Sequence, residues 1–85
     1  MKEVKYVIKD PLGIHARPAG KMVKLAGSYK CDIQISFSGK TANAKRIIGL
    51  MALAVKQNDE ITLTFSGEDE EEAACAIEKF LTENF

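Results

Sequence analysis

The sequence predicts an α+β fold, a two-layer sandwich in which three helices cover one face of a four-stranded antiparallel sheet. Three segments alternate apolar and polar residues, as strands do when one face packs and the other meets water, and a tight turn after the second predicts a short further strand. Three other segments carry apolar residues at helical spacing. Because the chain has 85 residues, 46% of them hydrophobic and 28% charged, we expect a single globular domain over residues 1–85.

The first strand and the first helix are separated by a turn. Residues 3–9 alternate and predict a strand, and residues 10–13 have the composition of a turn. A helical pattern begins at Ala16, and Gly27 is expected to end the helix. The inward side chains would be Val4, Tyr6 and Ile8 of the strand and Ala19, Met22, Val23 and Ala26 of the helix.

A hairpin and a second helix follow. Residues 31–37 alternate, and Ser38-Gly39 fits a tight turn into a short strand over residues 40–43. Helical spacing then returns over residues 47–54. Its stripe is Ile47, Leu50, Met51 and Ala54, with Ile48 and Leu53 outside it. We expect Leu50 and Ala54 to belong to the core.

The last part predicts a turn at residues 57–59, a strand over 61–65 that Gly67 ends, and a third helix. The acidic run over residues 68–72 suits the start of that helix, where the helix dipole is positive. It lacks the alternation of a calcium loop, so a calcium site is disfavoured. The buried stripe of the helix would be Ala73, Ile77, Phe80 and Leu81.

The net charge is zero but is unevenly distributed. The first 58 residues hold eleven Lys and Arg against three acidic residues, and the last 27 hold one Lys against nine acidic residues. A basic face would attract an anionic ligand or an acidic partner, whereas the alternative is a solvated surface whose halves pair. Nucleic-acid binding is disfavoured, because the chain is not basic overall. The candidate basic residues are Arg17, Lys21, Lys24, Lys45 and Arg46.

We expect a cytoplasmic protein without membrane insertion. The longest apolar run, residues 47–55, is too short to span a bilayer, and the first residues lack the apolar region of a signal peptide. Cys31 and Cys75 have no C-x-x-C spacing, so we predict reduced thiols, with a disulfide as the less favoured alternative. With a single histidine and no clustered cysteines, no metal site is predicted.

The single histidine, His15, is the candidate reactive residue. Pro18 belongs in the first turn of a helix, which places His15 at or beside the N-cap. The free N–H groups of Ala16 and Arg17 would then bind an anion, aided by the guanidinium. No serine, cysteine or carboxylate stands close to His15 in the sequence to make a triad, but neutral imidazole is itself a nucleophile. The residues therefore predict phosphorylation of His15 in a cradle of Ala16, Arg17 and Pro18, and the alternative is an unreactive structural histidine.

The stretch Gly13-Ile14-His15-Ala16-Arg17-Pro18-Ala19 resembles the active-site motif of the HPr family, the histidine-containing phosphocarriers of the bacterial sugar phosphotransferase system. Similarity continues through residues 38–45, 47–53 and 67–69, and covers essentially the whole chain. The resemblance implies an open-faced sandwich with strand order 1-4-2-3. It also implies that His15 accepts a phosphoryl group on Nδ1, that Arg17 stabilises the transferring group, and that the protein is a monomeric carrier without a cofactor rather than an independent enzyme.

The resemblance also implies the partners. Phosphorylated enzyme I, charged from phosphoenolpyruvate, would donate the group, and the IIA domain of a sugar permease would receive it. Both would dock around His15 on the first and second helices. The expected docking residues are Lys21, Lys24, Ile47, Ile48 and Met51.

Two positions depart from the family pattern. Arg46 stands where many members have a serine that a regulatory kinase phosphorylates, which puts that regulation in doubt. Leu12 stands where the family often has a small polar residue, so no side-chain hydrogen bond to the site is expected from that position. Two alternatives to a sugar phosphocarrier remain: a regulatory module of the same fold that only docks partners, and a component of a nitrogen-related branch.

Overall fold

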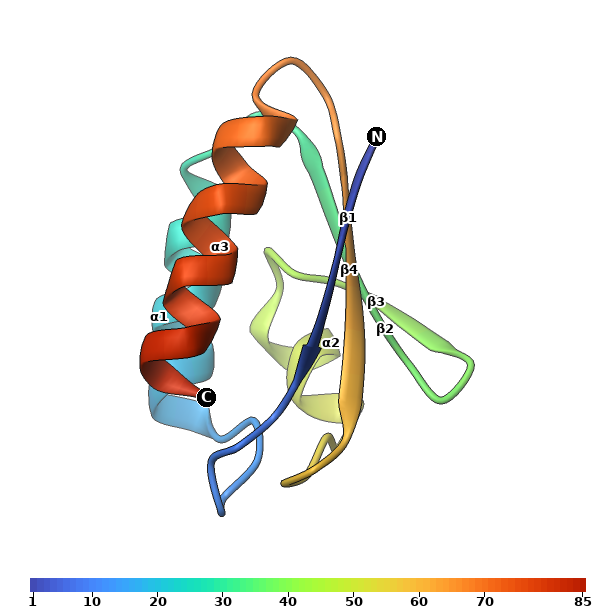
Figure 1. Cartoon of the computed structure of the whole chain (residues 1–85), viewed down its shortest axis with the longest axis vertical. Coiled ribbons are helices and arrows are strands. Elements are labelled where there is room, and N and C mark those ends of the chain that lie inside the picture. The colour runs from blue at the N-terminus through green and yellow to red at the C-terminus, as the bar shows by residue number, and fades with distance from the viewer.

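The computed structural model describes residues 1–85 and confirms the predicted order of elements. The strands are β1 (Lys2–Val7), β2 (Asp32–Phe37), β3 (Lys40–Asn43) and β4 (Glu60–Ser66). The helices are α1 (Ala16–Gly27), α2 (Ile47–Ala52) and α3 (Glu70–Asn84). All three helices lie on one side of the sheet, with α1 and α3 next to each other (Figure 1).

The four strands form one antiparallel sheet in the order β1-β4-β2-β3, as the family resemblance implies. The register pairs Tyr6 with Ile61 and Ile35 with Leu63. Because paired residues point to the same face, these apolar residues of β1, β4 and β2 all face the helices. The opposite face carries polar residues such as Thr62 and Ser36, which also pair.

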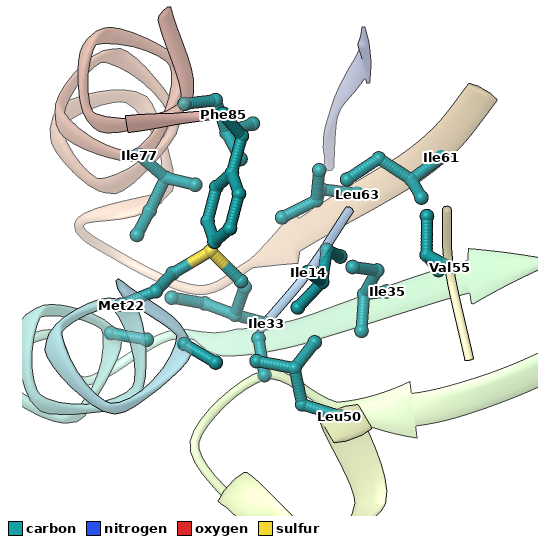
Figure 2. Packing of buried hydrophobic residues seen from close by; sticks show 14 of the residues in the cluster. Ile14, Met22, Ile33, Ile35, Leu50, Val55, Ile61, Leu63, Ile77 and Phe85 are labelled. Carbon is teal, nitrogen blue, oxygen red and sulfur yellow. The ribbon is translucent and has the colours of Figure 1, made fainter. Parts of the chain in front are cut away.

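The core lies between the sheet and the helices. Its 20 buried residues are all hydrophobic. Figure 2 shows Met22, Ile77, Leu50 and the strand residues Ile35 and Leu63 converging on this interior. No polar or charged side chain is buried in it. Apart from the buried Cys31 thiol, the reactive side chains of this protein therefore lie at or near the surface.

The β2–β3 hairpin turns through two residues in the left-handed region. Ser38 has φ 51° and Gly39 has φ 80°. Positive φ at both central positions is typical of the two-residue turns whose twist matches that of the flanking strands. The predicted Ser38-Gly39 turn is confirmed.

The prediction for the end of the second helix is wrong. α2 stops at Ala52, and Ala54 is exposed with φ 54° instead of continuing the buried stripe. Leu53 and Val55 are buried in its place. The chain leaves the helix early because the Val55 carbonyl accepts a hydrogen bond from the Ile14 N–H at 3.1 Å, a contact that a longer helix would prevent.

Smaller differences occur at the ends of α1 and α3. Gly27 is the last residue of α1 but does not take a left-handed conformation; instead the Ser28 hydroxyl donates to the Leu25 carbonyl at 2.6 Å. In α3, Ala74 is buried and Phe80 only half-buried. The acidic run does begin this helix, as predicted.

The acidic start of α3 also fastens a distant loop. Asp69 accepts hydrogen bonds from the backbone N–H groups of Lys30 and Cys31 at 2.8 and 2.9 Å. Both cysteines are free thiols; burial raises the pKa of Cys31, whereas Cys75 is exposed on α3. None of the helices has the length and apolar character needed to span a membrane.

Candidate functional site

His15 occupies the N-cap position of α1, where the sequence predicts it. Its backbone is extended, with φ −110° and ψ 167°, and its carbonyl accepts the Ala19 N–H at 3.0 Å. The side chain is 32% exposed. The ring therefore lies at the surface, supported on one side by the protein and open to a partner on the other.

Two backbone donors of the first turn of α1 are free. The N–H groups of Ala16 and Arg17 have no acceptor within the chain, because a helix leaves its first donors unpaired. Pro18 follows, buried and without an N–H. Arg17 is exposed and contributes a guanidinium to the same turn. These groups together give an anion site next to the imidazole.

The loop before α1 is fixed by a close approach of two chain segments. Gly13 has φ 67°, and a Cβ added there would lie 2.4 Å from the Val55 carbonyl oxygen. Ile14 is buried and bound to the same carbonyl. Only glycine fits both the backbone angle and the space. Residues 13 and 14 thus anchor His15 to the connection between α2 and β4.

A carboxylate that the sequence analysis did not assign to the site lies beside His15. Asp10 Oδ2 is 3.3 Å from Nε2 of the ring. Asp10 lies five residues before His15 in the sequence, and the turn brings it back: its carbonyl accepts the Gly13 N–H at 2.9 Å. The sequence signal for this contact was an aspartate at the start of a turn directly before the histidine motif.

Phe85 is a second neighbour of His15 that the sequence analysis missed. Its buried ring meets the imidazole edge to face, with centroids 6.3 Å apart and planes at 84°. The Phe85 carbonyl accepts the N–H groups of Lys9 and Asp10 at 2.6 and 2.8 Å. Figure 1 shows the C-terminus beside the β1–α1 loop. Phe85 continues the helical stripe of Ile77 and Leu81, a spacing that could have revealed it.

The predicted basic residues do not all face the site. Arg17, Lys21, Lys24 and Arg46 are exposed on α1 and at the start of α2. Lys45 is half-buried, and its Nζ donates to the Tyr29 carbonyl at 2.7 Å, just beyond the far end of α1 from His15. The Lys45 ammonium is therefore engaged in a contact within the chain, whereas the other four cations are exposed.

The apolar docking candidates differ in exposure. Ile48 is 83% exposed and Ile47 38%, whereas Met51 is partly buried against the core. A Cβ added at Gly20 of α1 would lie 3.6 Å from Ile47 Cδ1, so the start of α2 packs near the first turns of α1. Leu12, in the loop before His15, is also exposed.

The other chemical features of the surface lie elsewhere. The one groove lies between β1 and α3, lined by residues such as Val4, Ala74 and Cys75. No group of three or more His, Cys, Asp or Glu side chains is arranged to hold a metal ion. The chemistry of the molecule therefore concentrates at the start of α1.

Comparison with known proteins identifies similar chains over nearly the full length. A family model described as "PTS HPr component phosphorylation site" matches residues 2–83. A protein named phosphocarrier protein HPr from Mycoplasma pneumoniae is 49% identical over 82 residues, which cover 95% of this chain and 93% of that protein.

Solved structures show the same fold. A histidine-containing phosphocarrier protein from Mycoplasma superposes with a TM-score of 0.94 at 34% identity, covering 96% of this chain and 93% of that one. An HPr dimer from Thermoanaerobacter tengcongensis superposes with a TM-score of 0.78 at 40% identity, covering 98% and 95%. Dimers therefore occur among the similar proteins.

Proposed function

The chain belongs to the HPr family, the phosphocarrier component of the phosphotransferase system, and we propose that His15 carries the phosphoryl group on Nδ1. The observation that carries this assignment is the partly exposed ring at the N-cap of α1, next to two unpaired backbone N–H groups. Nε2 faces Asp10, which leaves Nδ1 as the ring nitrogen without a partner in the chain.

The transfer needs a nucleophile and a binding site for the moving anion. The Nδ1 lone pair attacks phosphorus, and the donor leaves with the electron pair of its bond to phosphorus. The phosphoryl oxygens then lie against the N–H groups of Ala16 and Arg17, and the guanidinium neutralises their charge. Delivery reverses these steps at the acceptor. Because the P–N bond of a phosphohistidine is energy-rich, the group can be passed on as well as received.

The donor and acceptor we propose are phosphorylated enzyme I, charged from phosphoenolpyruvate, and the IIA domain of a sugar permease. They would dock on α1 and the start of α2, around His15. Exposed Lys21 and Lys24 suit acidic partner surfaces, and Ile47, Ile48 and Met51 provide an apolar contact. In this role the protein works in the cytoplasm during sugar uptake, as a monomer and as a carrier rather than an independent enzyme.

Arg46 separates this chain from members with a regulatory serine. It occupies the N-cap of α2 and makes no capping hydrogen bond through its side chain. A serine kinase transfers a phosphoryl group to a side-chain hydroxyl, and arginine has none. We therefore propose that an ATP-dependent HPr kinase does not modify this position.

The function is tested by mixing the chain with enzyme I, phosphoenolpyruvate and a IIA domain. Intact mass spectrometry should find one acid-labile phosphoryl group on the wild type and none on His15→Ala, and only the wild type should relay phosphate to IIA. Cys75→Ser, a change at an exposed residue on α3, should behave as the wild type. Relay by His15→Ala would overturn the assignment.

A further inference from the structure

Resting on the proposed function of His15, we infer that Asp10 is its positioning residue. The Asp10 carboxylate accepts a hydrogen bond from the Nε2–H group of the ring. This contact orients the ring so that the Nδ1 lone pair points toward the phosphoryl donor. The contact behind this inference is the 3.3 Å separation of Oδ2 and Nε2.

Asp10 is held in place independently of the histidine. Its Oδ1 accepts the Leu12 N–H at 2.8 Å, and its own N–H donates to the Phe85 carbonyl at 2.8 Å. Each carboxylate oxygen thus has a separate partner: the loop backbone holds Oδ1, and Oδ2 faces the ring. The Leu12 N–H, and after it the contact with His15, hold the pKa of Asp10 below its ordinary value. The group is therefore an anion at neutral pH.

An ionised carboxylate can only accept a hydrogen bond, and neutral imidazole carries one N–H. Oδ2 therefore favours the tautomer with the proton on Nε2 and the lone pair on Nδ1. The Phe85 ring, edge to face with the imidazole, restricts the plane in which His15 can lie. Selection of the tautomer and restriction of the ring together aim Nδ1 outward.

The same contact stabilises the product of transfer. When the N–P bond forms and the donor keeps its electron pair, the ring becomes positively charged and retains its proton on Nε2. The Asp10 anion then faces a cation, and a hydrogen bond between charged groups is shorter and stronger than one to a neutral ring. Because the Leu12 side chain cannot form a hydrogen bond, the polar neighbour of the ring in this loop is residue 10 instead.

The variant that isolates this role is Asp10→Asn. An amide oxygen can still accept the Leu12 N–H and preserve the loop, but the negative charge facing the ring is gone. Asp69→Asn is the matched control, because Asp69 also accepts backbone N–H groups and lies at the start of α3, whereas His15 lies beside the helix's C-terminal end. Both variants change the net charge equally.

The rate of phosphate acceptance and the tautomer of the His15 ring together test the role of Asp10. With limiting phosphorylated enzyme I, Asp10→Asn should accept phosphate about ten- to a hundred-fold more slowly than the wild type. Asp10→Glu should be faster than Asp10→Asn but slower than the wild type, and Asp69→Asn should accept phosphate at the wild-type rate. Ring ¹⁵N shifts should show a smaller fraction of Nε2–H tautomer in Asp10→Asn than in the wild type.

A role confined to the loop would leave the tautomer and the rate of Asp10→Asn unchanged, and that result overturns the inference. A wild type that takes no phosphate on His15 would instead overturn the proposed function, while the tautomer comparison would still test Asp10 by itself.

Discussion

At the scale of single residues, three kinds of group surround the His15 ring. Unpaired amides at Ala16 and Arg17 provide anion binding, the Asp10 carboxylate faces Nε2, and the Phe85 ring packs edge to face. The imidazole therefore meets a different chemistry on each side. This asymmetry gives its two nitrogens different tasks, although free imidazole distinguishes them only weakly.

Arg17→Ala should slow phosphoryl transfer while leaving the fold intact, because the side chain is exposed and its removal opens no cavity. Removing one preorganised charge stabiliser typically costs about 10²–10³-fold in rate. Arg17→Lys should recover part of this decrease, since it restores charge without the planar fork. Rapid-quench kinetics with phosphorylated enzyme I measure the rates. A rate for Arg17→Ala equal to that of the wild type removes the guanidinium from the mechanism.

At the scale of elements, local patterns explain most of what could be predicted. Alternation identified β1, β2 and β4, and the Ser38-Gly39 pair identified the hairpin and with it the short β3, since both signals depend on neighbouring residues. The end of α2 could not be predicted, because it is set by the bond from Ile14 to the Val55 carbonyl.

The candidate site likewise has a part that local sequence predicted and a part that depends on tertiary contacts. The place of His15 followed from Pro18, three residues away in sequence. Its contacts with Asp10 and Phe85 depend on the turn closing and on the C-terminus packing beside it. Tertiary contacts of this kind leave only weak traces in a sequence, such as the stripe spacing of Phe85.

Ala54→Gly should stabilise the protein. Ala54 follows α2 in a left-handed conformation, with φ 54°, which costs a residue with a Cβ about 1–2 kcal/mol. Part of that gain is offset by the greater freedom of glycine in the unfolded chain, so we expect about 0.5–1 kcal/mol from urea unfolding. Ala52→Gly, at the last residue of α2 and without a positive φ, is the control and should destabilise by about 0.5–1 kcal/mol. Equal effects of the two changes would contradict the assigned end of α2.

Ile48→Ser should weaken partner docking without weakening the fold. Because the Ile48 side chain is 83% exposed, the free energy of unfolding should change by less than about 0.5 kcal/mol. The KM for the chain as a substrate of enzyme I should rise about five-fold or more, as for an interface residue worth over 1 kcal/mol. Val7→Ser, at an exposed apolar residue of β1, should leave that KM unchanged. An unaltered KM for Ile48→Ser excludes this residue from the interface.

At the scale of the whole molecule, the late acidic residues have structural roles that the net charge conceals. Asp69 ties α3 to the start of β2, and Glu70 pairs with the Met1 ammonium at 2.8 Å. Together with Asp10, these carboxylates join chain segments that are distant in sequence or fix the loop at the site. Asp69 and Glu70 of the acidic part of the sequence therefore stabilise contacts within the fold, while the exposed cations of α1 have no ion pair within the chain.

This arrangement predicts that the protein loses stability in acid. The pKa values of Asp10, Asp69 and Glu70 are lowered, chiefly by the Leu12 N–H, the Lys30 N–H and the Met1 ammonium respectively. A carboxyl with a lowered folded pKa stabilises the protein fully above its unfolded pKa, about 4, and the contribution disappears as the pH falls through the folded value. Urea unfolding should therefore give constant stability from these groups above about pH 5 and a decline below it.

Asp69→Asn should make that acid decline shallower, because one of the three titrating contacts is then absent. The control is Glu83→Gln, at an exposed residue near the end of α3 for which the structure gives no ion pair. A pH dependence identical in Asp69→Asn and the wild type would show that this carboxylate does not contribute.

The most direct test of the central claim is NMR of the phosphorylated chain, labelled with ¹⁵N in the His15 ring and the backbone. We expect a nitrogen–phosphorus coupling at Nδ1 of His15 and large shifts of the Ala16 and Arg17 amides as they bind the phosphoryl oxygens. Phosphate found on Nε2 or on another residue, or amides that do not respond, would contradict the account.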